Sequence, residues 1–256
     1  MSVVLGTVTT VLRFPVKSMR GEHLPAGDLG PSGLDGDREW ALLDDDDHWA
    51  SAKADRGRWR LFDGMLDLVT SGAGAAVDVR LPDGRTVRPG TPDADAVLSA
   101  HLGRTLHFDR GDAGRRWGRH HDAAPLHLVT TATLAALHSD EDGVPAEREA
   151  LDPLRLRPNL VVDTGAASTG FAEDAWVGTT LRVGGALLRA TETTGRCVMT
   201  TRAQADELPR DTTVLKRIGA RNGADAGIYL TVLQAGRVAV GDELVVVEPG
   251  PGIIGS

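Results

Sequence analysis

The stretch LRVGGALLRATETTGRC, residues 181–197, joins two apolar runs through a pair of glycines and ends at the only cysteine of the chain. Leu181–Val183 and Ala186–Ala190 have the length of β-strands, and Gly184-Gly185 between them is typical of a tight hairpin turn. We therefore expect a β-hairpin here, with Cys197 downstream of its second strand.

The rest of the chain repeats this pattern of short apolar runs separated by glycine, aspartate and proline. Further strands are expected at Val3–Arg13, Trp40–Leu43, Val77–Leu81, Thr86–Arg88, Leu160–Val162, Ile228–Leu233 and Glu243–Val247. Short helices are expected at 91–103, 130–138 and 211–218. The predicted fold class is mainly β (α+β), with two β-rich domains or one barrel preceded by an N-terminal β domain. The irregular segment Asp109–Pro125 predicts the boundary between them.

Composition limits the classes of partner. Of 256 residues, 41% are hydrophobic and 25% are charged, as in ordinary globular proteins. The formal net charge of -8 argues against binding to nucleic acid or to an anionic membrane surface. No run approaches the roughly 20 apolar residues of a membrane span, and the N-terminus lacks the apolar core of a signal peptide. With one unpaired cysteine, these features predict a soluble cytoplasmic protein.

Cys197 can act only as a single sulfur atom, because one cysteine cannot form an internal disulfide, a four-cysteine zinc site or an iron–sulfur cluster. Arg196 beside it favours the thiolate, and Gly195 allows a ligand to approach the backbone closely. Two interpretations stay open on the residues alone: a reactive or metal-binding thiolate, or a small buried apolar side chain.

Two basic segments are candidate anion sites. Lys17 and Ser18 leave a strand with an ammonium group and a hydroxyl, which suits a phosphate, although the residues alone favour an ordinary lysine at a strand end. Arg155 and Arg157 are two residues apart, so on an extended chain their side chains point the same way and form an anion clamp. The alternative for this pair is a surface stretch that forms salt bridges.

Two other charged or ligating runs predict no metal. The acidic run Asp44–Asp47 matches no spacing of a calcium loop and is expected to be a solvated turn. The adjacent His120 and His121 point to opposite faces of an extended chain, so they are not expected to share an ion. A solvated or anion-facing loop is expected there.

Taken in order, six short strings resemble the MOSC family, the domain shared with the C-terminus of molybdenum-cofactor sulfurase. The strings are Phe14-Pro15-Val16-Lys17-Ser18, Gly36-Asp37-Arg38 with Trp40, Arg157-Pro158-Asn159, Glu173-Asp174-Ala175-Trp176 with Gly178, Arg196-Cys197 with Thr200-Thr201, and Gly241-Asp242. The resemblance runs from Val8 to about Val247. It is greatest to the amidoxime-reducing components and their bacterial relatives.

The resemblance implies an N-terminal MOSC β-barrel domain at residues 1–110, a MOSC domain at 111–249 and a flexible tail at 250–256. It also implies a molybdenum cofactor of the molybdopterin type, with Cys197 as the catalytic metal ligand. The residues implied to contact or lie near the cofactor are Lys17, Ser18, Arg38, Arg157, Asn159, Arg196 and Tyr229. Relatives often carry hydroxyl residues where this chain has Ala123 and Ala124, so a contact there must be made by the backbone or shift to Thr130 or Thr131.

The function that the resemblance implies is reduction of small N-hydroxylated compounds, such as amidoximes or hydroxylamines. Electrons must come from a separate protein, because the sequence carries no flavin, nicotinamide or iron–sulfur motif. Two alternatives remain. In one, Cys197 carries a persulfide or holds the cofactor without reductase turnover; in the other, the chain is a non-catalytic barrel with an inert cysteine.

Overall fold

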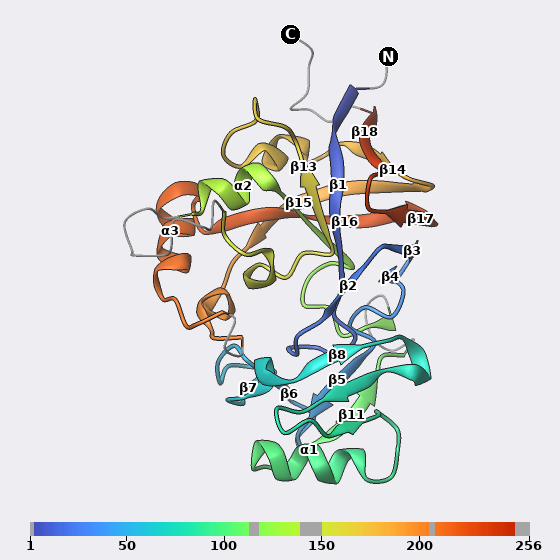
Figure 1. Ribbon diagram of the computed structural model, residues 1–256, viewed down its shortest axis with the longest axis vertical. Coiled ribbons are helices and arrows are strands. Elements are labelled where there is room, and N and C mark those ends of the chain that lie inside the picture. Colours follow the sequence, from blue (N-terminus) through green and yellow to red (C-terminus); the bar gives the residue numbers. More distant parts are fainter. Residues whose placement is uncertain (1–2, 113–117, 139–149, 205–207, 249–256) are drawn as a thin grey trace.

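A computed structural model describes residues 3–112, 118–138, 150–204 and 208–248 (Figure 1). Within this part, the chain is mostly β structure with three α-helices, so the predicted mainly β fold class is confirmed. Two lobes are visible, with a β-barrel in the upper half of Figure 1 and smaller sheets with α1 in the lower half. The predicted tail at 250–256 lies outside the described residues.

The upper lobe is a closed barrel of seven strands. In order around the barrel, these are β13 (Leu160–Asp163), β12 (Leu126–Thr130), β16 (Asp225–Gln234), β15 (Ala186–Gly195), β14 (Thr180–Val183), β18 (Glu243–Glu248) and β1 (Val3–Arg13). The β1–β13 pairing closes the ring, and β2 (Glu22–Leu24) adds to β1 at one end. Neighbouring strands are antiparallel except β12 and β13, which are parallel. Closure leaves the seven strands without an unpaired edge and surrounds an apolar interior.

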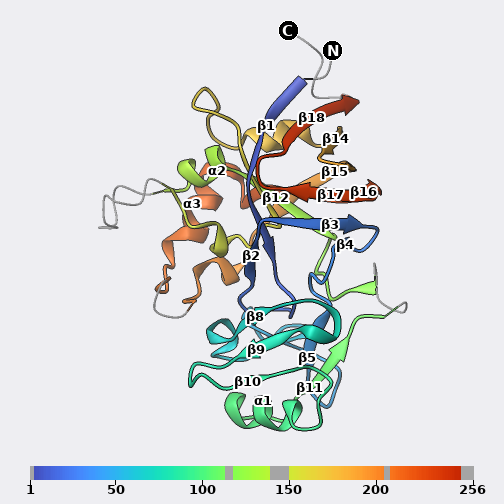
Figure 2. The same ribbon diagram turned by 45° about the vertical axis from the view of Figure 1, so that its right-hand side comes forward.

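The first strand of the chain belongs to this barrel. Thr7 of β1 pairs with Asp163 of β13, and Val3 pairs with Val246 of β18. Figure 2 shows β1 running from the top of the barrel down toward the lower lobe. The division into domains at residue 110 stays a prediction, but the pairing shows that residues 3–13 complete a barrel built mainly from residues after 126.

The lower lobe is built from small sheets around its own apolar core. One sheet has the order β11 (His107–Arg110), β5 (Trp40–Leu43), β6 (Trp49–Ser51) and β7 (Trp59–Leu61), and another has β10 (Thr86–Val87), β9 (Asp78–Arg80) and β8 (Val69–Ser71). A third sheet, β17 (Gly236–Ala239), β3 (Ala26–Gly30) and β4 (Gly33–Leu34), pairs chain from both ends of the sequence. The apolar side chains of this third sheet, Leu29, Leu34 and Val238, pack into the core of the barrel, so the sheet belongs to the upper lobe.

The helices differ slightly from their predicted ends. Helix α1 (Ala94–Leu102) ends at left-handed Gly103 as expected, but it starts two residues after the proline that was expected to open it. Helix α2 (Thr131–Ala136) is capped by the Thr130 side chain, which accepts from the Thr133 amide. Helix α3 (Thr213–Asn222) starts later and runs longer than expected, because left-handed Gly223 ends it.

The predicted hairpin at 181–190 is confirmed, since Leu181 pairs with Leu188 across β14 and β15. Of the expected solvated or anion-facing loop, the solvated alternative is wrong: His120 is fully buried and His121 is 6% exposed. His120 accepts from the Trp49 indole at 3.1 Å, whereas the His121 ring contacts the Ser32 carbonyl at 3.0 Å, so the two rings serve different partners. No described helix has the length and apolar character to cross a membrane.

Candidate cofactor pocket

A pocket of about 160 Å³ lies between the lobes and is lined by residues from both. Six of the lining side chains are basic, and one is a carboxylate, Asp122. The basic residues are Lys17, Arg38, Lys53, Arg155, Arg157 and Arg196. An acidic protein has therefore concentrated positive charge at one site, which favours binding of an anion.

Cys197 lies at the edge of this pocket with its side chain exposed. It follows the end of β15 and precedes a short 3₁₀ helix, Val198–Thr201. Its carbonyl accepts from the backbone amide and the hydroxyl of Thr200, at 3.1 and 3.0 Å, which fixes the turn. The interpretation of Cys197 as a buried apolar side chain is therefore wrong, and its sulfur is reachable from the pocket.

Lys17 is 4% exposed and reaches across the lobe boundary. Its ammonium donates to the His120 carbonyl at 2.8 Å and to Asp122 at 2.6 Å, and it lies 4.1 Å from the centre of the Trp49 ring. Burial lowers the pKa of Lys17 to about 8, although Asp122 acts in the opposite direction. The alternative of an ordinary strand-end lysine does not describe this buried ammonium.

Three non-glycine pocket residues have left-handed backbone: Ser18, Arg38 and Arg157, with φ of 64°, 49° and 54°. Such residues pay a steric cost that surrounding contacts must offset. Both arginine side chains lie over the Phe14 ring, with guanidinium carbons 5.0 and 4.1 Å from its centre. Buried Asp37 holds this arrangement, because it accepts from the Phe14 amide at 2.8 Å and from Arg38. The strained backbone thus turns two cations into the pocket.

Among the residues that line the pocket, two buried guanidinium nitrogens have no hydrogen-bond partner: Nη1 of Arg157 and Nε of Arg196. Burial, with Arg38 nearby, lowers the pKa of Arg157 to about 9, and burial also lowers the pKa of Arg196. Buried donors without acceptors are rare and destabilising. These atoms therefore point to an anionic group that the pocket is built to hold.

The predicted anion clamp of Arg155 and Arg157 is wrong for its first member. Arg155 donates to three backbone carbonyls of the following loop, those of Thr200, Arg202 and Pro209, at 3.4, 3.4 and 2.6 Å. The sequence was read as extended here, but Pro153–Arg155 is a 3₁₀ turn and Arg157 is left-handed, so the two side chains diverge.

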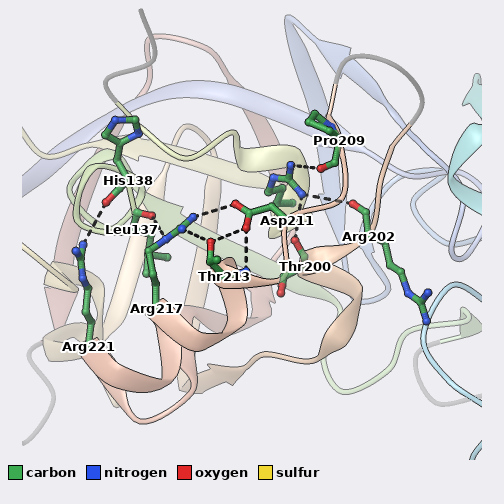
Figure 3. A network of polar contacts seen from close by, with 10 residues as sticks. Leu137, His138, Thr200, Arg202, Pro209, Asp211, Thr213, Arg217 and Arg221 are labelled. Carbon is green, nitrogen blue, oxygen red and sulfur yellow. Dashed lines mark hydrogen bonds and ion pairs between the residues drawn. The ribbon is translucent and has the colours of Figure 1, made fainter. Parts of the chain in front are cut away.

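Figure 3 shows the loop that Arg155 holds, with Thr200, Arg202 and Pro209 labelled around the contacts. The far end of the loop joins α3, where Asp211 accepts from the Thr213 amide at 2.8 Å and from Arg217 at 3.2 Å. Arg155 therefore positions the segment that follows Cys197, while Arg157 alone supplies a donor without a partner.

Asn159 and Tyr229 also line the pocket. The Asn159 side chain accepts from the His127 amide and donates to the Leu12 carbonyl, both at 3.2 Å, so it joins β1 to β12. Burial raises the pKa of Tyr229, whose ring packs edge-on against His127 with 5.9 Å between ring centres. Both predicted residues are at the pocket, but the Asn159 amide has backbone partners.

Lys53, Asp122 and His127 line the pocket although the sequence analysis did not select them. Lys53 donates to Asp122 at 2.5 Å, and burial holds the pKa of His127 well below its ordinary value. Their signal in the sequence is weak, because each lies outside the six strings that carry the family resemblance.

Ala123 and Ala124 line the pocket, as a backbone contact requires. The alternative shift to Thr130 or Thr131 does not occur, because the Thr130 hydroxyl donates to buried Glu173 at 2.6 Å and the Thr131 hydroxyl donates to Asp163 at 2.9 Å. Burial raises the pKa of Glu173, which supports the barrel rather than the pocket.

This geometry defines a class: a β-barrel protein with a basic, lobe-spanning pocket beside an exposed thiol. The particular family follows from the sequence matches, which are to the MOSC domain over residues 111–245 and to the MOSC N-terminal beta barrel domain over residues 5–56. The chain belongs to the MOSC family.

Solved structures resemble the chain only distantly. The YUAD protein from Bacillus subtilis is 14% identical, with a TM-score of 0.49 over 96% of this chain and 98% of its own. YiiM from Geobacillus stearothermophilus is 20% identical, with a TM-score of 0.37 over 51% of this chain and 58% of its own. No curated protein matches the sequence. These likenesses carry no weight for the function.

Proposed function

We propose that this protein is a molybdenum-cofactor-binding oxidoreductase that reduces N-hydroxylated compounds, such as amidoximes or hydroxylamines. One observation carries the proposal. In a chain of the MOSC family, the exposed thiol of Cys197 borders a pocket in which buried donors of Arg157 and Arg196 lack acceptors.

The residues present fit a molybdopterin-type cofactor. A soft thiolate suits molybdenum, and six basic side chains suit a ligand with a phosphate and further negative charge. Cys197 would hold the metal, and Lys17, Ser18, Arg38, Arg157 and Arg196 would hold the rest of the group. When bound, the cofactor supplies the redox chemistry for removing oxygen from an N–O bond.

Reduction of an N-hydroxyl group to N–H releases water and consumes two electrons and two protons. The electrons come from a separate redox protein and the protons from solvent. Burial raises the pKa of Tyr229, so its phenol stays protonated at neutral pH and can donate a hydrogen bond to an oxygen atom of the substrate. His127 stays neutral because burial lowers its pKa, and it adds no further positive charge.

The decisive experiment compares molybdenum content in wild type and Cys197→Ser. We expect metal analysis to find at least a tenfold lower molybdenum content in the variant, because a hydroxyl is a poor substitute for a soft ligand. Val198→Ala, at the exposed neighbouring position, is the matched control and should retain the metal. Equal molybdenum in wild type and Cys197→Ser would overturn the proposal.

Turnover separates the reductase from a protein that only holds the cofactor or carries sulfur. Molybdenum-loaded protein should reduce benzamidoxime to benzamidine with reduced methyl viologen as an artificial electron donor. Loaded protein that gives no benzamidine would favour the cofactor-handling alternative.

A further inference from the structure

A second cavity, of about 280 Å³, lies beside the cofactor pocket. Its walls are Ala52 and 61–67 of the lower lobe, and Arg202, Ala203 and Arg210 of the loop after Cys197. We call it the side cavity. Lys53 separates it from the cofactor pocket: its side chain lines the pocket, while its carbonyl accepts from Nη2 of Arg202 at 3.0 Å.

Arg202 is held in place at several points. Its amide donates to the Met199 carbonyl at 3.2 Å, and its own carbonyl accepts from Arg155 at 3.4 Å. Figure 3 shows the Arg202 side chain directed away from the network around Asp211. With Nη2 bound to Lys53, the guanidinium has a defined orientation at the wall of the side cavity.

The Nε of Arg202 is buried and has no hydrogen-bond partner. Arg210, which also lines the cavity, is exposed and forms no ion pair with any described residue. Asp63 and Asp67 lie on the opposite wall, but both are at least partly exposed, so water can hydrate their carboxylates. The buried Nε has no such substitute, so the missing group is a hydrogen-bond acceptor.

We propose that the side cavity is an anion subsite that binds a carboxylate on the substrate, with Arg202 as its specificity-determining residue. This proposal rests on the proposed reductase function. Arg202 is five positions after Cys197, with the 3₁₀ helix Val198–Thr201 between them, so their Cα atoms lie roughly 10 Å apart at about 2 Å per residue. A substituted aromatic ring spans such a distance. The cavity of about 280 Å³ has room for a small anion but not for the surface of a docking protein.

The test uses a matched series of amidoximes on the cofactor-loaded protein. The ligands are benzamidoxime, 4-carbamoylbenzamidoxime, 4-carboxybenzamidoxime and a longer propanoate with the carboxylate two methylenes further out. We expect calorimetry and KM to show that at least one carboxylate binds about tenfold more tightly than the neutral compounds, as a charge-assisted hydrogen bond requires. Arg202→Gln should abolish this preference, measured as the ratio of carboxylate to neutral affinity.

Arg237→Gln is the control, because it removes the same charge from an exposed position on β17. It should retain the preference for carboxylates. The anion subsite is overturned if neither carboxylate is preferred, if the carbamoyl compound binds equally well, or if Arg202→Gln weakens all ligands alike. Reduction of benzamidoxime in those cases would leave the proposed function standing. Conversely, a carboxylate preference in calorimetry without any turnover would support the subsite and count against the reductase.

Discussion

The acidic turn at Asp44–His48 and the cofactor pocket both contain many charged groups. The buried carboxylate of the turn has hydrogen-bond partners within the turn, whereas the pocket contains buried donors without partners. One Asp44 oxygen accepts from the amides of Asp46 and His48, at 3.0 and 2.9 Å, and lies 3.2 Å from the His48 ring. Burial works against the charge, yet these bonds hold the pKa of Asp44 below its ordinary value. Although Asp44, Asp46 and His48 are close enough to share an ion, this oxygen already has its donors.

In the pocket, by contrast, some buried polar groups have no hydrogen-bond partner. Donors of Arg157 and Arg196 are buried without acceptors, and Ser18, Arg38 and Arg157 hold left-handed backbone. The acidic turn is one short segment that satisfies its own backbone, whereas the pocket gathers like charges from distant segments. In this protein, the charged residues of the acidic turn stabilise the turn itself. The candidate ligand site lies where the fold leaves buried hydrogen-bond donors without acceptors.

Arg157→Met should give the largest effect. We expect molybdenum retention after dialysis to fall about 10- to 100-fold, because charge-assisted contacts to the anion are lost. The free energy of unfolding of the metal-free protein should stay level or rise, since the variant removes a buried donor that has no acceptor. Urea unfolding checks this. A loss of several kcal/mol in the metal-free protein would mean that Arg157 supports the fold instead.

The pH dependence of stability gives a second test of this contrast, through the titration of Lys17. Its pKa is about 8 in the folded protein and near 10.5 when unfolded, so between these values the unfolded chain binds more protons. The stability of the metal-free protein should therefore rise with pH across this window, by at most about 3 kcal/mol from this residue. Cofactor retention should fall over the same range, because the neutral amine attracts no anion.

Lys17→Met provides the reference for this pH experiment. The unfolding free energy of metal-free wild type, measured relative to the variant, should increase from pH 8 to pH 10. A difference that stays flat, or that falls with pH, would show that the Lys17 ammonium is stabilised rather than penalised by its surroundings.

Half of the strands were predictable because their signal is local. Apolar runs gave Val3–Arg13 with correct ends, and the glycine turn gave the hairpin at 181–190, although its second strand runs on to Gly195. The strands that the sequence did not predict are β2, β3, β4, β6, β7, β8, β11, β12 and β17. The pairing of β1 with β13 was not predictable, since closure of a barrel joins residues more than 150 positions apart. The buried state of His120 had the same cause, because its partner Trp49 comes from another segment.

The resemblance to the MOSC family identified pocket residues that the local sequence pattern could not distinguish from ordinary charged residues. Arg38 and Arg157 meet there over the Phe14 ring, and Lys17 is held beside them by the His120 carbonyl and Asp122. None of these contacts is visible as a spacing in the sequence. The role of Arg155 was not predictable for a related reason. The spacing of Arg155 and Arg157 predicts an extended chain, whereas a 3₁₀ turn directs the Arg155 side chain to the backbone of the next loop.

The smallest expected effect lies in the acidic turn. Asp44→Ala removes the acceptor of two backbone amides and should lower the free energy of unfolding by about 1–2 kcal/mol, with molybdenum content unchanged. Asp45→Ala, at an exposed position of the same turn, is the matched control and should change stability little. Thermal unfolding of wild type with calcium chloride and with EDTA should give the same midpoint, because the Asp44 oxygen is occupied by donors of its own turn. A higher midpoint with calcium that Asp44→Ala abolishes would make this turn a metal site and break the contrast with the pocket.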